Sequence, residues 1–322
     1  MKLYVLSSMI IIAGAFSFSM SSCSSNADAK PTAVNEKDDA SGYGPEWKPS
    51  DEWKAYWYKG LAEVSSYEIM QGRYYESHPG NAVNIFVTED LSKERHVKLD
   101  IPSAAGKDRL PVLKLNQTIK FNTGIYPYSV MMSAFMPIDR KNYPHAAKVT
   151  SSIQDWCGMV FLQANSYDKK IELEQFSYFE GEGDSKATYT ETFLEDELWT
   201  LIRIAPEQLP QGKMKVIPST TYLRFSHKPI LAYDAELSVE DKGTTKVLTI
   251  NYPALQRRLD ITFNAAFPYA ITGWTEIYPG FGGTPLETKA VLKSSKMMDY
   301  WNLHRASDRA LRKELGLPEL YQ

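Results

Sequence analysis

The sequence predicts a mainly β protein, built on one large curved antiparallel sheet that forms a half-barrel or a barrel, with a few packing helices. Apolar and polar residues alternate in many segments, as at Val83, Ile85 and Val87, which is the period of a half-buried strand. Clusters of turn residues such as 78–81 separate these segments. The 20 Tyr, 13 Phe and 7 Trp residues favour strands and supply large buried areas.

Strands connected as successive hairpins are the main expectation along the chain. The first, 61–77, is expected to turn at His78-Pro79-Gly80-Asn81 into the second, 82–89. The others are predicted at 111–121, 125–136, 147–153, 156–164, 170–179, 214–217, 221–226, 230–239, 245–251, 257–264, 270–277 and 286–294.

Three helices are predicted, near 51–59, 190–204 and 298–315. Ser50-Asp51-Glu52 supplies a capping side chain and acidic residues for the first helix start. In the second, Leu194, Leu198, Leu201 and Ile202 form an apolar stripe, Glu195, Asp196 and Glu197 lie elsewhere, and Pro206 ends the helix. The third is predicted from Trp301, Leu311 and Leu315, with Gly316 at its end.

Two short segments resemble each other and raise the question of duplication. Phe121-Asn122-Thr123-Gly124-Ile125-Tyr126-Pro127-Tyr128 is similar to Phe263-Asn264-Ala265-Ala266-Phe267-Pro268-Tyr269, with one residue deleted. If both are the same corner of a repeated unit, the sheet consists of two duplicated halves. The alternative is a chance match, because such residues are common at strand ends.

The N-terminus has the features of a bacterial lipoprotein signal. Lys2 is followed by an apolar stretch that includes Ile10, Ile11 and Ile12, and then by Ser21-Ser22-Cys23. These are the positive, apolar and small-residue parts of a cleavable secretory signal. Cys23 is the predicted lipidation site, and its acyl chains, such as palmitate, would hold the protein firmly on a membrane. The alternative is an ordinary signal with a chance cysteine.

This signal divides the chain into three parts. Residues 1–22 are the predicted signal peptide, 23–45 a flexible tether with almost no large apolar side chain, and 46–322 a single domain. The predicted location is the bacterial cell envelope, with lipid anchoring to the outer membrane on a face that the sequence does not define. The membrane is thus the expected partner through Cys23. The formal net charge of −3 argues against nucleic acid as a partner.

No sequence motif indicates a catalytic site, a metal or another cofactor. Walker, Gly-x-Ser-x-Gly and His-Glu-x-x-His patterns are missing from the sequence, and 279–284 is glycine-rich without a phosphate-gripping lysine. With Cys23 assigned to lipid, Cys157 has no cysteine left for an internal disulfide. We expect Cys157 to be a buried structural residue within a strand, the alternative being a reactive thiol. The histidines, 78, 96, 145, 227 and 304, are scattered, and only His304 and Asp308 have a ligand-like spacing.

Four segments carry a resemblance to known proteins: Ser65-Ser66-Tyr67-Glu68, Asn84-Ile85-Phe86-Val87-Thr88-Glu89-Asp90, 121–128 and Asp155-Trp156-Cys157-Gly158. They resemble an uncharacterised lipoprotein family of the Bacteroidota whose members often carry the name "septum formation inhibitor Maf", and the similarity extends over most of 55–305. The name implies a nucleotide pyrophosphatase. The Ser-x-x-Arg-Arg-type phosphate-binding segment of genuine Maf enzymes is missing from this sequence.

These observations favour a membrane-anchored, non-enzymatic envelope lipoprotein that binds an apolar or lipid-like ligand, or a partner protein. One alternative is an envelope hydrolase that uses Cys157 or carboxylates at strand ends. A further alternative is the Maf-type pyrophosphatase that the family name implies.

The lipid anchor leads to a direct prediction. Replacing Cys23 with Ala removes the thiol that accepts the lipid, so the protein should leave the membrane fraction for the soluble fraction. Fractionation of cells followed by immunoblotting measures this change. A Cys157→Ala variant is the control and should stay with the membranes. Sedimentation of the Cys23→Ala variant with membranes would refute the anchor.

Overall fold

The computed structural model describes residues 47–167, 169–190 and 192–319. The predicted signal peptide, the tether and Cys23 lie outside the described residues. Residues 43–322 form one compact unit, and the description concerns this unit alone. Its core is a large apolar cluster to which residues from Trp53 to Ala290 contribute.

Fifteen strands of the described residues form one sheet, in the order β8-β7-β6-β5-β4-β3-β2-β1-β15-β14-β13-β12-β11-β10-β9. All neighbours are antiparallel except β9 and β10, which are parallel. The strands are β1 Ala62–Arg73, β2 Glu76–Ser92, β3 Arg109–Thr123, β4 Tyr126–Pro137, β5 Lys148–Gln154, β6 Met159–Tyr167, β7 Lys170–Ser177, β8 Ser185–Thr190, β9 Phe193–Leu194, β10 Gly212–Ile217, β11 Tyr233–Asp241, β12 Thr245–Tyr252, β13 Arg257–Asn264, β14 Ile271–Pro279 and β15 Pro285–Met298.

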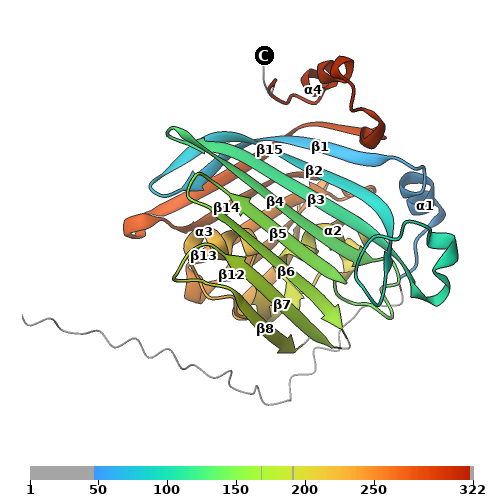
Figure 1. Cartoon of the computed structure of the whole chain (residues 1–322), viewed down its shortest axis with the longest axis horizontal. Helices are drawn as coiled ribbons and strands as arrows, with labels where there is room; N and C mark the ends of the chain where they lie inside the picture. Colours follow the sequence, from blue (N-terminus) through green and yellow to red (C-terminus); the bar gives the residue numbers. More distant parts are fainter. Residues whose placement is uncertain (1–46, 168, 191, 320–322) are drawn as a thin grey trace, which may run out of the picture. The chain divides into compact units, whose positions relative to one another are not determined.

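The predicted fold class is confirmed, and the sheet is open. The strands β8 and β9 form its two edges, and β1 pairs with β15 near its middle. The sheet curves so that β3–β8 face β12–β14, as Figure 1 shows. Each of the two similar segments, 121–128 and 263–269, lies at the turn of a hairpin. The strand directions place the two turns at opposite ends of the sheet.

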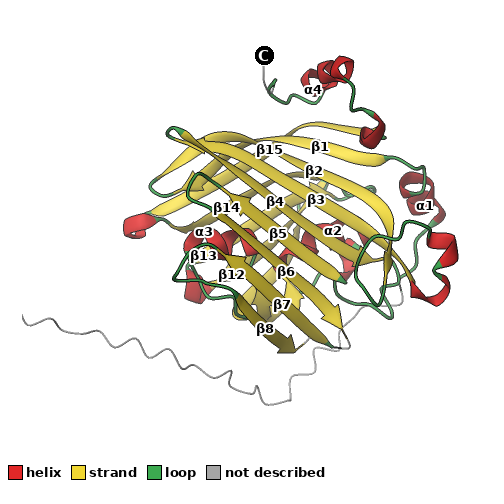
Figure 2. Cartoon of the chain, in the orientation of Figure 1, coloured by secondary structure: helices red, strands yellow, loops and turns green. Residues whose placement is uncertain are grey.

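Four α-helices accompany the sheet in the described residues: α1 Asp51–Trp57, α2 Glu195–Ile204, α3 Thr220–Ser226 and α4 Ala310–Glu314. Helices α2 and α3 lie between the two facing parts of the sheet (Figure 2). None of the helices in these residues is long and apolar enough to cross a membrane.

The helix prediction was accurate at α1 and less so elsewhere. Helix α2 begins at Glu195 rather than near 190, because residues up to Thr190 belong to β8. The predicted helix at 298–315 is wrong: β15 continues to Met298, where it pairs with Ala62. Only the short α4 and the 3₁₀ turns Tyr300–Asn302 and Ala306–Arg309 follow.

Two strand predictions were also wrong. Segment 221–226 lies entirely within α3, a helix buried on several sides, so its apolar residues do not form the single stripe that identifies a surface helix. The first hairpin turns at Tyr74-Tyr75, whereas 78–81 continues β2. Gly80 is needed there for close strand approach, because a Cβ atom would lie 2.4 Å from the Lys120 carbonyl oxygen.

Helix α2 is buried over its whole length, including its four charged residues Glu195, Asp196, Glu197 and Arg203. Arg203 donates two hydrogen bonds of 2.6 Å to the two carboxylate oxygens of Glu63 on β1. Burial opposes ionisation of Glu63, but the charge and hydrogen bonds of Arg203 outweigh it and keep the pKa of Glu63 below its ordinary value. The last turn of α2 is therefore fixed to the middle of the sheet.

The first turn of α2 is held by three other segments. Glu195 accepts hydrogen bonds from Arg257 on β13. Asp196 accepts two from Thr220 at the start of α3, and Glu197 contacts His145 and the Ala146 amide before β5. Carboxylates in a first helical turn are also stabilised by the helix dipole. The helix thus connects the two facing parts of the sheet.

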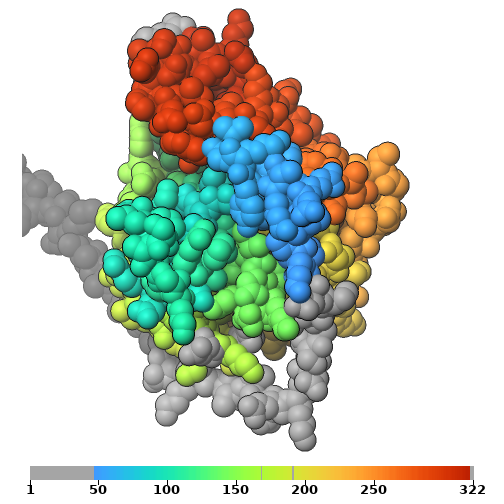
Figure 3. All heavy atoms as spheres, turned by 90° about the vertical axis from the view of Figure 1, so that its right-hand side faces the viewer, coloured from blue at the N-terminus to red at the C-terminus, as the bar shows by residue number. Residues whose placement is uncertain are grey.

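One end of the unit is covered by α1. Trp53 and Trp57 are buried in the core, and Thr88 donates a 3.1 Å hydrogen bond to the Trp57 carbonyl oxygen. Figure 3 shows α1, in blue, beside the teal loops that follow β2. This end lies at the start of β1, so the end of β1 at Arg73 is roughly 40 Å away at the usual rise per strand residue.

The Glu63–Arg203 pair provides a stability prediction. Arg203→Met should lower the free energy of unfolding by about 3–5 kcal/mol, because Glu63 is left buried and charged without its partner. Urea denaturation measures the change. The double variant Glu63→Leu/Arg203→Met should recover much of it. Lys215→Met, in the exposed Lys215–Asp234 pair, should cost less than about 1 kcal/mol. Equal losses in both pairs would contradict the assignment.

Candidate ligand-binding site

A cavity of about 410 Å³ lies at the end of β1 that is far from α1. Its size falls within the range of small-molecule sites, about 300–1,000 Å³. Four segments that are distant in sequence form it: the β1–β2 turn, α3, the β12–β13 turn and the β14–β15 turn. The lining residues are Arg73, Tyr74, Tyr222, Phe225, Ser226, Lys228, Ala254, Leu255, Gln256, Tyr278, Pro279, Gly280, Phe281 and Leu286. We call this the mouth cavity.

Arg73 is the buried charge of the mouth cavity, with 4% of its surface exposed. Its Nη1 donates to the Phe225 carbonyl oxygen at 2.6 Å, and its Nη2 lies 3.5 Å from the Tyr128 hydroxyl. The guanidinium stacks over the rings of Tyr74 and Phe225 at 4.2 and 4.7 Å. Its Nε has no hydrogen-bond partner among the described residues.

Three tyrosine hydroxyls lie next to this arginine. Tyr74 forms hydrogen bonds of 2.8 Å with Tyr126 and 2.6 Å with Tyr128. Burial raises the pKa of Tyr74 and of Tyr128, so both hydroxyls stay protonated at neutral pH. A protonated phenol can donate a hydrogen bond to an incoming group.

Exposed apolar side chains also lie at this end of the sheet. Phe281 contacts the Tyr75 ring, and Trp156 stacks on Tyr126. Ile125, in the next hairpin turn, is 85% exposed, and Trp156 is 68% exposed. Large apolar groups grouped in this way are characteristic of binding surfaces.

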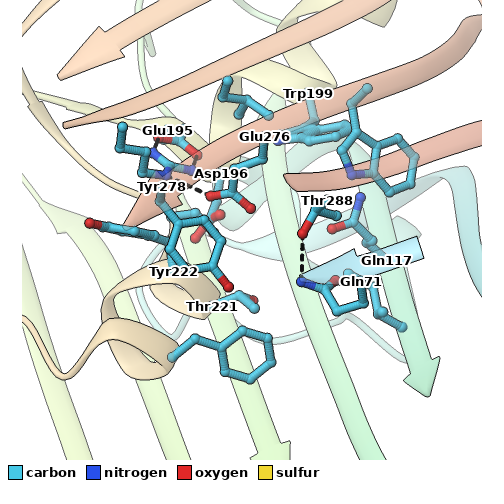
Figure 4. Close-up of a pocket in the computed structure, with 16 residues that line it drawn as sticks. Gln71, Gln117, Glu195, Asp196, Trp199, Thr221, Tyr222, Glu276, Tyr278 and Thr288 are labelled. Atoms are coloured by element: carbon cyan, nitrogen blue, oxygen red, sulfur yellow. Dashed lines mark hydrogen bonds and ion pairs between the residues drawn. The ribbon is translucent and has the colours of Figure 1, made fainter. Parts of the chain in front are cut away.

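A second, inner cavity shares Tyr222, Phe225 and Tyr278 with the mouth cavity. Its volume of about 40 Å³ has room for a few water molecules at most. Figure 4 shows Glu195, Asp196 and Glu276 on one side of it, and the hydrogen bond between Gln71 and Thr288 on the other.

The carboxylates of the inner cavity outnumber its cations. Arg257 bonds both Glu195 and Glu276, the latter through Nε at 2.6 Å. Burial raises the pKa of Asp196 to about 6, although the hydrogen bonds from Thr220 lower it. Burial also raises the pKa of Glu276. These groups fix α2 and α3 in the interior, and the space left among them is too small for an organic substrate.

The prediction that Cys157 is a buried residue within a strand is wrong. Cys157 is exposed, in the turn between β5 and β6, rather than buried in a strand. Asp155 accepts hydrogen bonds from the backbone N–H groups of Cys157 and Gly158 and so closes the turn. The described residues include no histidine hydrogen-bonded to the sulfur, so they do not form a Cys–His pair. Asp-Trp-Cys-Gly favours a turn through its Asp and Gly residues, a signal that the apolar neighbours obscured.

The histidines are separate in the structure, and the described residues contain no group of three or more His, Cys, Asp or Glu side chains that could hold a metal ion. His145 pairs with Glu197, and His227 with Glu182. His304 and Asp308 do not share a helix, because the chain forms 3₁₀ turns there. The residues 279–284 form the predicted loop, which also borders the mouth cavity.

Comparison with known proteins adds little to this site. No family model matches the chain, and no curated protein matches it. One solved structure, a porin-like protein from Bacteroides uniformis, is similar over 74% of this chain and 96% of its own, with 8% identity and a TM-score of 0.18. We draw no conclusion from a similarity at that score.

Asp196 leads to a pH prediction. Between its unfolded pKa near 3.8 and its folded pKa of about 6, the folded protein retains a proton that the unfolded chain releases. Its contribution to stability is therefore complete below pH 4 and is lost as the pH rises to 6, by about 3 kcal/mol. Asp196→Asn should abolish this loss.

Urea denaturation of both proteins from pH 4 to 8 measures the effect. The stability of the variant relative to the original protein should increase with pH and then level off above pH 7. The exposed Asp234→Asn is the control and should show no such trend. A constant difference between Asp196→Asn and the original protein would exclude this ionisation.

Proposed function

We propose that this protein is a membrane-anchored, non-enzymatic envelope lipoprotein whose curved sheet binds an apolar or lipid-like ligand in the mouth cavity. The observation that supports it most directly is the cavity itself, whose lining combines aromatic and aliphatic side chains with the polar groups of Arg73, Ser226 and Lys228. Its volume of about 410 Å³ lies in the range of small-molecule sites.

The interior favours binding over catalysis in this proposal. The inner carboxylates already interact with Arg257, Tyr252 and Thr220, and Cys157 lies in an exposed turn. A nucleophile requires an adjacent base or a lowered pKa. The lipid anchor at Cys23 would place the cavity near a source of amphiphiles, the membrane itself.

A partner protein is the second candidate. The exposed Ile125 and Trp156 beside the mouth cavity support it, since such groups are frequent in protein interfaces. The two functions differ in what they need: a ligand needs the open cavity, whereas a partner needs only the outer apolar groups.

The cavity can be tested by filling it. Ser226, on α3, lines the mouth cavity, and Ser226→Trp should occupy much of its space. We expect binding of the uncharged fluorescent probe phenylnaphthylamine to residues 43–322 to weaken at least about tenfold. Fluorescence titration measures this affinity. Ser238→Trp places the same residue on an exposed position of β11 and should leave binding unchanged.

Thermal unfolding must first show that both variants are folded. If the original protein binds no probe, or if the two variants bind the probe equally well, the proposal that this cavity binds a ligand is wrong.

A further inference from the structure

We infer that the mouth cavity selects amphiphiles with an anionic head group, and that Arg73 binds that group. The inference rests on the proposed function and adds the class of ligand. The shared chemistry is a carboxylate or phosphate oxygen at one end of an apolar chain.

The first argument is that Arg73 has no carboxylate partner among the residues that the structure describes. Four other arginines are buried in the described residues, and three of them pair with a carboxylate: Arg203 with Glu63, Arg224 with Glu182 and Arg257 with Glu195. The fourth, Arg140, donates to the carbonyl oxygens of Tyr143 and Pro144. Burial of a cation costs free energy unless an opposite charge or a set of hydrogen bonds compensates for it. Arg73 has one strong hydrogen bond, to a neutral carbonyl oxygen.

The aromatic rings around Arg73 replace part of its hydration, but they do not supply a negative charge that would neutralise the guanidinium. Tyr74 and Phe225 stack on the guanidinium. Contacts of this kind stabilise a buried cation only modestly. Arg203 and Arg257 also stack on rings, at 4.7 Å from Phe86 and 4.3 Å from Tyr222. Each nevertheless has a carboxylate, so ring contacts do not substitute for an anion elsewhere in this protein.

The second argument is the charge of the cavity wall. Its residues include two cations, Arg73 and the exposed Lys228, and no Asp or Glu. The inner cavity behind Tyr222 and Tyr278 has the opposite character. An anion entering from outside therefore meets positive charge at the mouth cavity and negative charge farther in.

The third argument is a buried donor without a partner. The Arg73 Nε is buried and has no hydrogen-bond partner among the described residues, and the Tyr74 hydroxyl, which is hydrogen-bonded to Tyr126 and Tyr128, lines the same cavity. Anionic oxygens accept short, strong hydrogen bonds from such groups. Around them, Leu255, Phe281 and Leu286 supply apolar surface for a hydrocarbon chain.

The experiment compares three chains of equal length with different head groups: dodecanoate, dodecyl phosphate and dodecanol. Each displaces phenylnaphthylamine from residues 43–322 at pH 8, below the critical micelle concentration. We expect both anions to bind about 10- to 100-fold more tightly than the alcohol, as a charged hydrogen-bonded pair predicts. Arg73→Gln removes the charge and keeps a neutral N–H donor, so it should reduce the preference for the two anions over dodecanol to less than about twofold.

Matched variants isolate the role of Arg73. Arg73→Lys preserves the charge without the guanidinium fork and should retain part of the preference. Arg258→Gln removes an exposed positive charge on β13 and should retain all of it. Thermal unfolding verifies that each variant is folded. The comparison of head groups on the original protein is informative even if Arg73→Gln fails to fold.

Each negative outcome has a separate meaning. Equal binding of the three compounds would refute the anion site while leaving the ligand cavity in place. Failure of all three to bind would refute the proposed function as well. Inorganic phosphate alone should not displace the probe below millimolar concentrations; binding as tight as that of dodecyl phosphate would refute the amphiphile and assign the site to free anions.

Discussion

The structure depends on four buried charged side chains of one short helix. Glu195, Asp196, Glu197 and Arg203 of α2 each interact with a different part of the chain. Since each would be costly to bury alone, the helix and its partners must come together in a single arrangement. The partners belong to β1, β13, α3 and the segment before β5, so this arrangement determines how the two parts of the sheet face each other.

The positions of the helices also determine where the mouth cavity lies. Helices α2 and α3 occupy the region between the facing strands, and α1 covers one end with Trp53 and Trp57. The mouth cavity lies at the other end, where α3 meets the hairpin turns. The mouth cavity is therefore a consequence of how α3 is fixed. Thr220 begins that helix and donates to Asp196, so the buried network of α2 and the position of Phe225 in the cavity wall are linked.

The sequence revealed the sheet because its signal is local, and it failed where tertiary contacts override local signals. Val83, Ile85 and Val87 alternate in β2 whatever packs on them. The charges at 195–197 resemble a solvated helix face, and only the distant Arg257 and His145 make their burial acceptable. Gly80 resembles a turn residue but serves close strand packing. Met298 seemed to start a helix, yet its pairing with Ala62 extends β15.

The candidate site was harder still to predict, because its residues are dispersed and individually ordinary. Arg73 ends a strand and Tyr74 begins the turn after it. Phe225 and Tyr278 come from segments about 150 and 200 residues away, and no spacing rule connects them. Their significance is electrostatic and appears only in three dimensions. The inner cavity contains Glu195, Asp196 and Glu276 with Arg257 as its cation, whereas the mouth cavity contains Arg73 and Lys228 without an acid. Since like charges repel strongly in a buried setting, the inner carboxylates would keep an anionic head group at Arg73.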